Sequence, residues 1–202
     1  MTRWSVRNAE RRDIPRLARI LARAFDAEPA MRWMLPDNQS RHQRLERFFA
    51  GAIRWLYLPL GGTDVAVGPD GIAASAVWCP PGRWKLPVWR FVLASPSIMR
   101  ALGQRGRAGQ QVMTALENHH PREPHWYLAA LGTDPSAQGQ GAAGTLLRSR
   151  LRLCDEQGEA AYLETADGRN VAIYERFGFR PIHHIEIPGG APSQWGMWRE
   201  PA

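Results

Sequence analysis

Lysine is almost missing from this chain, and cysteine is scarce. Lys85 is the one lysine, so 25 of the 26 basic residues are arginine. Two cysteines, Cys79 and Cys154, are too few for a disulfide framework or a cysteine-ligated metal cluster. We therefore expect no metal site and a reducing, cytoplasmic compartment.

Long apolar runs are also absent. The most apolar later stretch, residues 86–102, contains Arg90, Arg100 and two prolines, which argues against a membrane span. Charged residues interrupt the first 25 residues throughout, unlike a secretory signal. The sequence thus predicts no contact with a membrane.

What is present is an average globular composition with an excess of positive charge. The chain has 202 residues, 44% of them hydrophobic and 22% charged. A chain of this length can bury a stable hydrophobic core without the help of disulfides or structural metal ions. We expect one domain over residues 1–202, with a helical insert at about 83–120. The net charge of +7 favours an anionic partner. The basic residues are scattered, which weakens the alternative of a nucleic-acid-binding module.

The alternation of apolar patterns and chain breakers predicts a mixed α/β domain. A helix is expected to open within 138–144 and to end before Gly158. The other expected helices cover 13–25, 40–57, 110–117 and 170–177. The expected strands cover 4–7, 64–67, 72–79, 125–133, 161–166, 179–187 and 194–199.

The most informative stretch is a strand (125–133), a DPSA turn and a glycine-rich segment, QGQGAAG, that opens a helix. Small residues let a ligand approach the backbone, and the first amides of a helix have no intrahelical partner. These amides and the helix dipole favour a phosphate. A turn that merely packs the helix onto the sheet is the alternative. The expected phosphate-binding residues are Gln138, Gly139, Gln140, Gly141, Ala142, Ala143 and Gly144.

A nicotinamide-dinucleotide site is a competing interpretation of the same glycines. Gly139, Gly141 and Gly144 satisfy G-x-G-x-x-G, and Glu164 follows 20 residues later. However, five residues separate the end of the strand at Thr133 from Gly139, and about a quarter of the chain remains for further βα repeats. This interpretation therefore remains a minor alternative.

A second motif, NVAIYERFGF, covers residues 170–179. Asn170 and Tyr174 are four residues apart and share one helical face. A tyrosine beside a phosphate loop can give a proton to a leaving group, whereas a purely structural hydrogen bond is the alternative.

Together the motifs resemble the GNAT superfamily of acyl-CoA-dependent N-acetyltransferases. The resemblance covers most of the chain and is strongest over 123–187. The family pattern Q/R-x-x-G-x-G/A is matched at Gln138, Gly141 and Ala143. The pattern N-x-x-x-Y-E-x-x-G-F is matched at Asn170, Tyr174, Glu175, Gly178 and Phe179. The stretches EPHWYLAALGTDPSAQGQG, YLETADGRNVAIYERFGF and QWGMWREP resemble the puromycin N-acetyltransferase branch.

The resemblance implies a largely antiparallel mixed sheet, flanked by helices and splayed between its fourth and fifth strands, 125–133 and 161–166. The pantetheine arm of acetyl-CoA would pair with the backbone of Leu131 and Thr133, with Gly132 easing a bulge between them. The pyrophosphate would lie on the amides of residues 138–144. Asn170 would contact the pantetheine or acetyl end.

The resemblance also implies direct transfer of an acetyl group to an amine in a ternary complex. Tyr174 would protonate the leaving thiolate, and an amide near Leu131 would stabilise the oxyanion. Glu164 is the expected base; an ion pair of Glu164 with an arginine, or an ordered water as the base, are the alternatives. His119 and His120 are expected in an exposed loop before the strand.

The acceptor is expected to be a small-molecule amine, such as an aminonucleoside or an antibiotic-like compound. An acidic group with aromatic walls suits a cationic or aromatic amine, although tryptophans are also common in cores. A protein lysine or N-terminus is the alternative acceptor, and a monomer or homodimer is expected. The candidate acceptor-binding residues are Asp26, Glu28, Trp33, Trp78 and Trp195.

Overall fold

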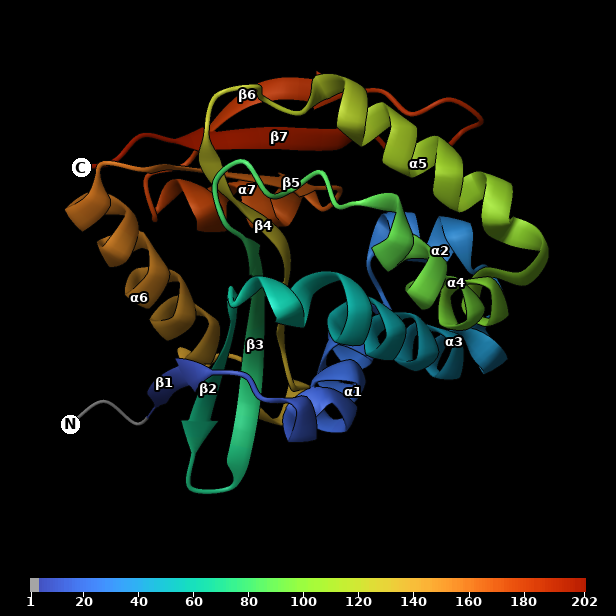
Figure 1. Ribbon diagram of the computed structural model, residues 1–202, viewed down its shortest axis with the longest axis horizontal. Coiled ribbons are helices and arrows are strands. Elements are labelled where there is room, and N and C mark those ends of the chain that lie inside the picture. Colours follow the sequence, from blue (N-terminus) through green and yellow to red (C-terminus); the bar gives the residue numbers. More distant parts are fainter. Residues whose placement is uncertain (1–3) are drawn as a thin grey trace.

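A computed structural model describes residues 4–202. Its centre is a seven-stranded sheet in the order β1-β2-β3-β4-β5-β7-β6 (Figure 1). The strands are β1 (Ser5–Asn8), β2 (Thr63–Gly68), β3 (Gly71–Cys79), β4 (His125–Thr133), β5 (Ala160–Thr165), β6 (Arg180–Ile185) and β7 (Gln194–Arg199). Neighbouring strands are antiparallel except for β4 and β5, which are parallel. The predicted fold class is confirmed.

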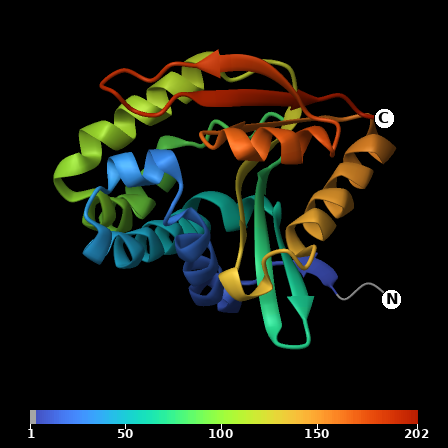
Figure 2. The ribbon, with the colours of Figure 1, turned by 180° about the vertical axis from the view of Figure 1, so that it is seen from behind.

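Helices cover both faces of this sheet (Figures 1 and 2). The α6 face carries α6 (Ala142–Gln157) and α7 (Gly168–Glu175). The α1 face is covered by α1 (Ile14–Phe25), α2 (Pro29–Met34), α3 (Asn38–Gly51) and α5 (Gly106–His119), with α4 (Val88–Leu102) packed against α3. The sheet is therefore the middle of three layers.

Three helical segments differ from the prediction. The helix expected at 40–57 is α-helical only to Gly51 and continues as a π-helical turn over 52–57. A short helix that the sequence did not predict, α2, begins at Pro29 behind the Glu28 cap. Helix α5 begins at Gly106, four residues before the start predicted at residue 110.

The parallel contact between β4 and β5 is short. His125–Leu128 pairs with Ala160–Leu163, whereas β4 continues to pair with β3 as far as Thr133. Within the described chain, residues 129–133 of β4 thus have a strand partner on one side only. Backbone groups need hydrogen-bond partners, so this edge of β4 is open to a ligand or to water.

The bulge of β4 lies at Ala129, so the expectation of a bulge at Gly132 is wrong. Val77 pairs with Ala130 and Trp78 with Leu128, which leaves Ala129 as the extra residue. At Gly132, a Cβ would lie 2.8 Å from Leu21 Cδ2 and 2.9 Å from the Cβ of Ala24. The glycine therefore serves the close approach of α1 to the strand.

A buried ion pair fixes α6 on the sheet. Arg150 Nη2 of α6 lies 2.7 Å from Asp64 Oδ2 of β2, and the Arg150 guanidinium lies 4.4 Å from the centre of a Trp126 ring. Removing one partner of such a pair leaves the charge of the other partner buried and uncompensated. This pair and the packing of Leu146 and Leu147 hold the N-terminus of α6 beside the end of β4.

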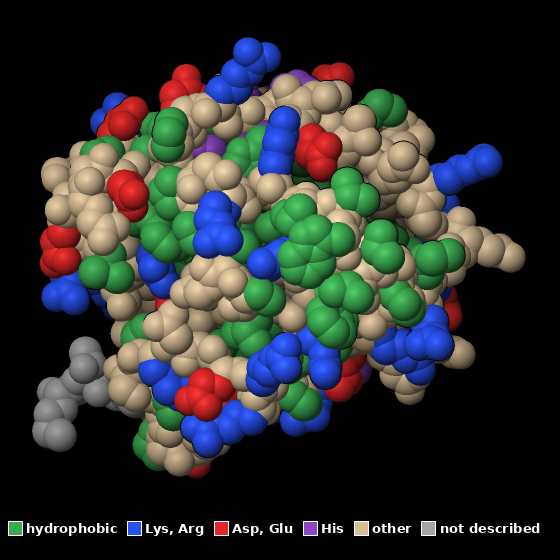
Figure 3. Space-filling view, viewed as in Figure 1, with side chains coloured by type: hydrophobic (Ala, Val, Ile, Leu, Met, Phe, Trp, Pro, Cys, Tyr) green, Lys and Arg blue, Asp and Glu red, His purple; other side chains and the backbone are tan. Residues whose placement is uncertain are grey.

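The outer surface of α4 is unusually apolar. None of the helices in residues 4–202 is long and apolar enough to cross a membrane. Figure 3 shows hydrophobic side chains mixed with Lys and Arg side chains on the face that contains α4. The large apolar side chains that α4 exposes are Val88, Trp89, Phe91, Val92, Leu93 and Met99.

Candidate active site

The loop after β4 turns twice through glycines before α6 begins. Gly139 and Gly141 have φ values of +73° and +83°, a conformation that favours glycine. Apart from the glycine and its chain neighbours, no heavy atom of residues 4–202 lies within 4 Å of a Cβ built at either position, so the backbone conformation requires these glycines. Because α6 begins at Ala142, its first amides have no intrahelical partner. The Gln138 and Gln140 amides donate to the carbonyl oxygens of Pro135 and Ala137. The amides open to a ligand therefore include those of the first turn of α6.

Asp134 ties the start of this loop to α1. Its Oδ2 lies 3.1 Å from Arg16 Nη2 and 3.6 Å from Arg23 Nη1, and its Oδ1 accepts hydrogen bonds from Ser136. Burial opposes ionisation, but the Ser136 hydrogen bonds and the two arginines lower the pKa of Asp134 below its ordinary value. The carboxylate therefore stays charged and holds the loop in place.

Arg148 is a basic residue at this turn that the sequence reasoning missed. A Cβ on Gly144 would lie 3.3 Å from Arg148 Nη1, so the guanidinium lies over the first turn of α6. The spacing of four residues on one helix was the signal available. Arg148 adds a cation to the anion-favouring end of the helix.

Tyr174 and Asn170 lie on α7, beside the open end of β5. Tyr174 packs against the core of the α6 face, with its ring centre 6.0 Å from that of Phe179. Burial raises the pKa of Tyr174 to about 12, so the phenol keeps its proton at neutral pH. Asn170 Nδ2 donates a hydrogen bond of 3.3 Å to Thr165 Oγ1.

Glu164 lies where β4 and β5 part. It follows Leu163, the last β5 residue paired with β4, and its side chain is only 3% exposed. Its Oε1 lies 3.5 Å from His120 Nδ1 and has no hydrogen-bond partner within the described residues. Among residues 4–202, no arginine forms an ion pair with Glu164, and His120 is charged only when it is protonated.

Neutral donors surround Glu164 on the α1 face. Burial raises the pKa of the Tyr57, Tyr127 and Tyr162 phenols, and the nearby Glu164 carboxylate raises it further. The same two causes raise the pKa of the Cys79 thiol to about 12. All four groups therefore keep their protons at neutral pH.

A glycine in β7 makes room for this cluster. Gly196 pairs with Glu164, and a Cβ there would lie 2.6 Å from Tyr162 Oη. Any larger residue would have to displace the phenol.

The structure corrects the expectation for His120. His119 ends α5 and is exposed as expected, but His120 is only 9% exposed. The indole of Trp84, from the segment between β3 and α4, stacks on the His120 ring with 3.7 Å between centres. The segment before β4 is therefore covered by a residue distant in sequence.

Two of the five candidate acceptor-binding residues lie near the open end of β5. Glu28 caps α2, its Oε2 accepting from the Met31 amide at 2.7 Å. Burial raises the pKa of Glu28, and the charge of the nearby Asp167 raises it further. Trp195 pairs with Thr165, and its indole lies 3.4 Å from a Cβ built on Gly168.

The other three candidates have partners of their own or are buried in the core. Asp26 Oδ1 lies 3.5 Å from Arg41 Nε. The Trp33 ring lies 5.1 Å from the Arg105 guanidinium and packs against the core of the α1 face. The expectation that Trp78 binds the acceptor is wrong, because this residue has no exposed surface and is packed in the core of the α6 face.

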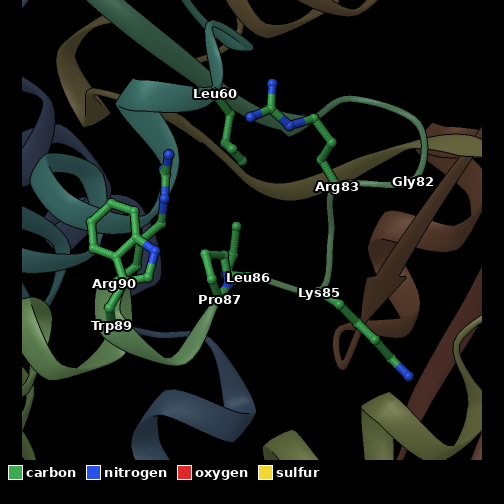
Figure 4. A pocket seen from close by; sticks show the side chains of 8 residues that line it. All are labelled: Leu60, Gly82, Arg83, Lys85, Leu86, Pro87, Trp89 and Arg90. Atoms are coloured by element: carbon green, nitrogen blue, oxygen red, sulfur yellow. The ribbon is translucent and has the colours of Figure 1, made fainter.

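A hollow of about 330 Å³ lies between β3 and α4, outside the predicted site (Figure 4). In Figure 4, Leu60 and Leu86 face the hollow, whereas Lys85 points away from it. Its lining residues are Leu60, Gly82, Arg83, Lys85, Leu86, Pro87, Trp89 and Arg90.

Comparison with known proteins agrees with this geometry. Residues 107–179 match the model of the acetyltransferase (GNAT) family. A curated, uncharacterised N-acetyltransferase of Schizosaccharomyces pombe is 27% identical over 192 residues, which cover 87% of this chain and 74% of that protein.

Solved structures resemble the whole chain. One from Corynebacterium glutamicum, described as histone acetyltransferase HPA2 and related acetyltransferase, is 28% identical with a TM-score of 0.77 and covers 100% of this chain and 98% of that one. The polyamine N-acetyltransferase of Drosophila melanogaster is 16% identical with a TM-score of 0.63, covers 98% of this chain and 99% of that one, and shows the fold alone. These matches support membership of the GNAT acetyltransferase family, and the chain is an acetyltransferase with the GNAT fold.

Proposed function

We propose that residues 1–202 form one N-acetyltransferase domain that transfers an acetyl group from acetyl-CoA to the amine of a small cationic or aromatic molecule. GNAT-fold enzymes generally use acetyl-CoA. The open edge of β4 at 129–133, continuous with the glycine turn at 138–144, carries the proposal. Free main-chain groups suit an extended amide-containing arm, and helix-end amides suit a diphosphate.

The residues at this edge fit the cofactor. In the proposal, the main chain of Leu131 and Thr133 pairs with the pantetheine arm, and the amides of 138–144 hold the pyrophosphate together with Arg148. Asn170, held by Thr165, contacts the arm nearer to the acetyl group. Acetyl-CoA supplies an activated acetyl thioester when bound.

The remaining chemistry belongs to side chains at the point where β4 and β5 part. Glu164 takes the proton of the attacking amine, since it is buried beside neutral donors and has an oxygen without a partner. Tyr174, which keeps its proton at neutral pH, donates that proton to the departing sulfur. A main-chain amide near Leu131 donates to the acyl oxygen.

Glu28 and Trp195 support an acceptor that is both cationic and flat. A carboxylate and an indole near one opening can bind an amine by charge and by stacking. The stretches that resemble the puromycin N-acetyltransferase branch favour an aminonucleoside or a related antibiotic. Acetylation of a protein lysine or N-terminus is the second candidate, favoured by the similarity to the Corynebacterium structure described as histone acetyltransferase HPA2 and related acetyltransferase.

Release of free CoA tests the proposed function. We expect CoA to appear only when acetyl-CoA and an amine are both present, and faster with aminonucleosides or small polyamines than with histone-tail or N-terminal peptides. In a thermal melt, acetyl-CoA should raise Tm more than NAD or a DNA duplex does, because ligands stabilise the state they bind. Equal shifts from all three ligands, or a shift with NAD alone, would contradict the proposal.

A further inference from the structure

Three side chains form a continuous line of contacts beneath Trp84, from the segment before β4 to Glu164. His125 Nδ1 lies 2.6 Å from the carbonyl oxygen of Glu123. The Nε2 atoms of His125 and His120 are 3.0 Å apart. His120 Nδ1 in turn lies 3.5 Å from Glu164 Oε1.

The outer end of this line fixes where the imidazole protons lie. A carbonyl oxygen only accepts, so His125 Nδ1 must carry a hydrogen. Burial lowers the pKa of His125 to about 4, so its ring is neutral at neutral pH and its Nε2 is an acceptor. The contact between the two Nε2 atoms then needs a hydrogen on His120 Nε2.

That assignment leaves His120 Nδ1 as the atom that faces Glu164. Without a further proton, a nitrogen lone pair points at a carboxylate, and Glu164 Oε1 is buried without a hydrogen-bond partner. One added proton satisfies both atoms, either as an imidazolium beside a carboxylate or as an imidazole beside a carboxylic acid. The two groups together are therefore a site for a single proton.

The other groups around the pair do not compete for this proton at neutral pH. The phenols of Tyr57, Tyr127 and Tyr162 and the thiol of Cys79 all keep their own protons, since burial and the carboxylate raise their pKa. From the β3–α4 connection, the Lys85 ammonium lies 5.1 Å from the centre of the Trp84 ring, and the Trp84 indole stacks on the His120 ring.

We propose that His120 and Glu164 act as one proton acceptor for the attacking amine. As the new bond to carbon forms, an N–H bond of the amine breaks and its proton is bound between Glu164 and His120 Nδ1. His125 and the Glu123 carbonyl hold His120 in the tautomer that can receive it. This inference rests on the proposed function, and His120 is a positioning residue because it acts through Glu164.

The pH dependence of kcat/KM tests the inference. The variant His120→Phe keeps a ring beneath Trp84. We expect the acid limb of its kcat/KM profile to move to lower pH by about one unit, and the plateau value of kcat/KM to fall roughly tenfold. The limb moves down because a carboxylate alone binds its proton at lower pH than the carboxylate and imidazole together. The KM for acetyl-CoA should stay unchanged. His119→Phe, at the exposed neighbouring histidine, should leave the limb in place.

An acid limb that stays in place in His120→Phe, or moves equally in His119→Phe, would overturn the inference. The nitrogen-15 spectrum of the unmodified protein tests the tautomers without a variant. We expect hydrogen on His125 Nδ1 and on His120 Nε2; hydrogen on His125 Nε2 overturns the relay. If every amine fails to release CoA, the proposed function fails and the inference with it, whereas an unmoved limb overturns the inference alone.

Discussion

Replacing Glu164 with glutamine should lower kcat by about 10²–10³-fold, because an amide cannot take the proton of the attacking amine. The shape of the residue is kept, so the pairing of β5 with β7 should persist. Acetyl-CoA should bind as tightly as before, since the Glu164 side chain lies on the α1 face of the sheet and not at the turn formed by residues 138–144. Steady-state rates of CoA release, together with calorimetric binding of acetyl-CoA, separate the two effects.

Glu159 provides a matched control for this substitution. It directly precedes β5, and its Oε2 accepts a 2.6 Å hydrogen bond from Trp126 Nε1, away from the point where the strands part. Glu159→Gln should change kcat less than about threefold, while Glu164→Gln changes it a hundredfold or more. Similar rates for Glu164→Gln and the unmodified protein would leave an ordered water as the better candidate base.

Tyr174→Phe should also lower kcat by about 10²–10³-fold, with little change in the affinity for acetyl-CoA. The substitution removes only the hydroxyl, and the ring can keep its contact with Phe179. Because the phenol pKa is raised to about 12, the unmodified enzyme holds this proton across the usual assay range. The leaving thiolate would lose its proton donor in the variant.

The variant Phe179→Leu separates the packing of the Tyr174 ring from proton donation by its hydroxyl. This change disturbs the neighbour of the Tyr174 ring in the core but leaves the hydroxyl present. We expect it to lower the free energy of unfolding by about 1–2 kcal/mol, with a far smaller loss of kcat than in Tyr174→Phe. Unchanged turnover in Tyr174→Phe would remove this residue as the acid.

Local sequence predicted most elements around the site. The continuous apolar run 125–133 ends at a turn-forming Asp-Pro-Ser, and β4 has these bounds. The glycine turn and α6 followed from small residues before a helical pattern. In each case the signal lies within a few neighbouring residues.

Other features depend on contacts between distant segments, which a local pattern does not contain. The bulge at Ala129 is defined by pairing with Val77 and Trp78 on β3. His120 is buried because Trp84 stacks on it. Trp78 lies in a run of β3 buried on both faces, where alternation does not distinguish a core tryptophan from one that lines a pocket.

Hydrogen exchange with and without CoA tests the central claim most directly. The account predicts that CoA slows exchange at the amides of 129–133 and 138–144, while amides of β1 and α4 exchange as before. Saturating CoA that leaves those two segments unprotected, or that protects the hollow beside α4 instead, would contradict it.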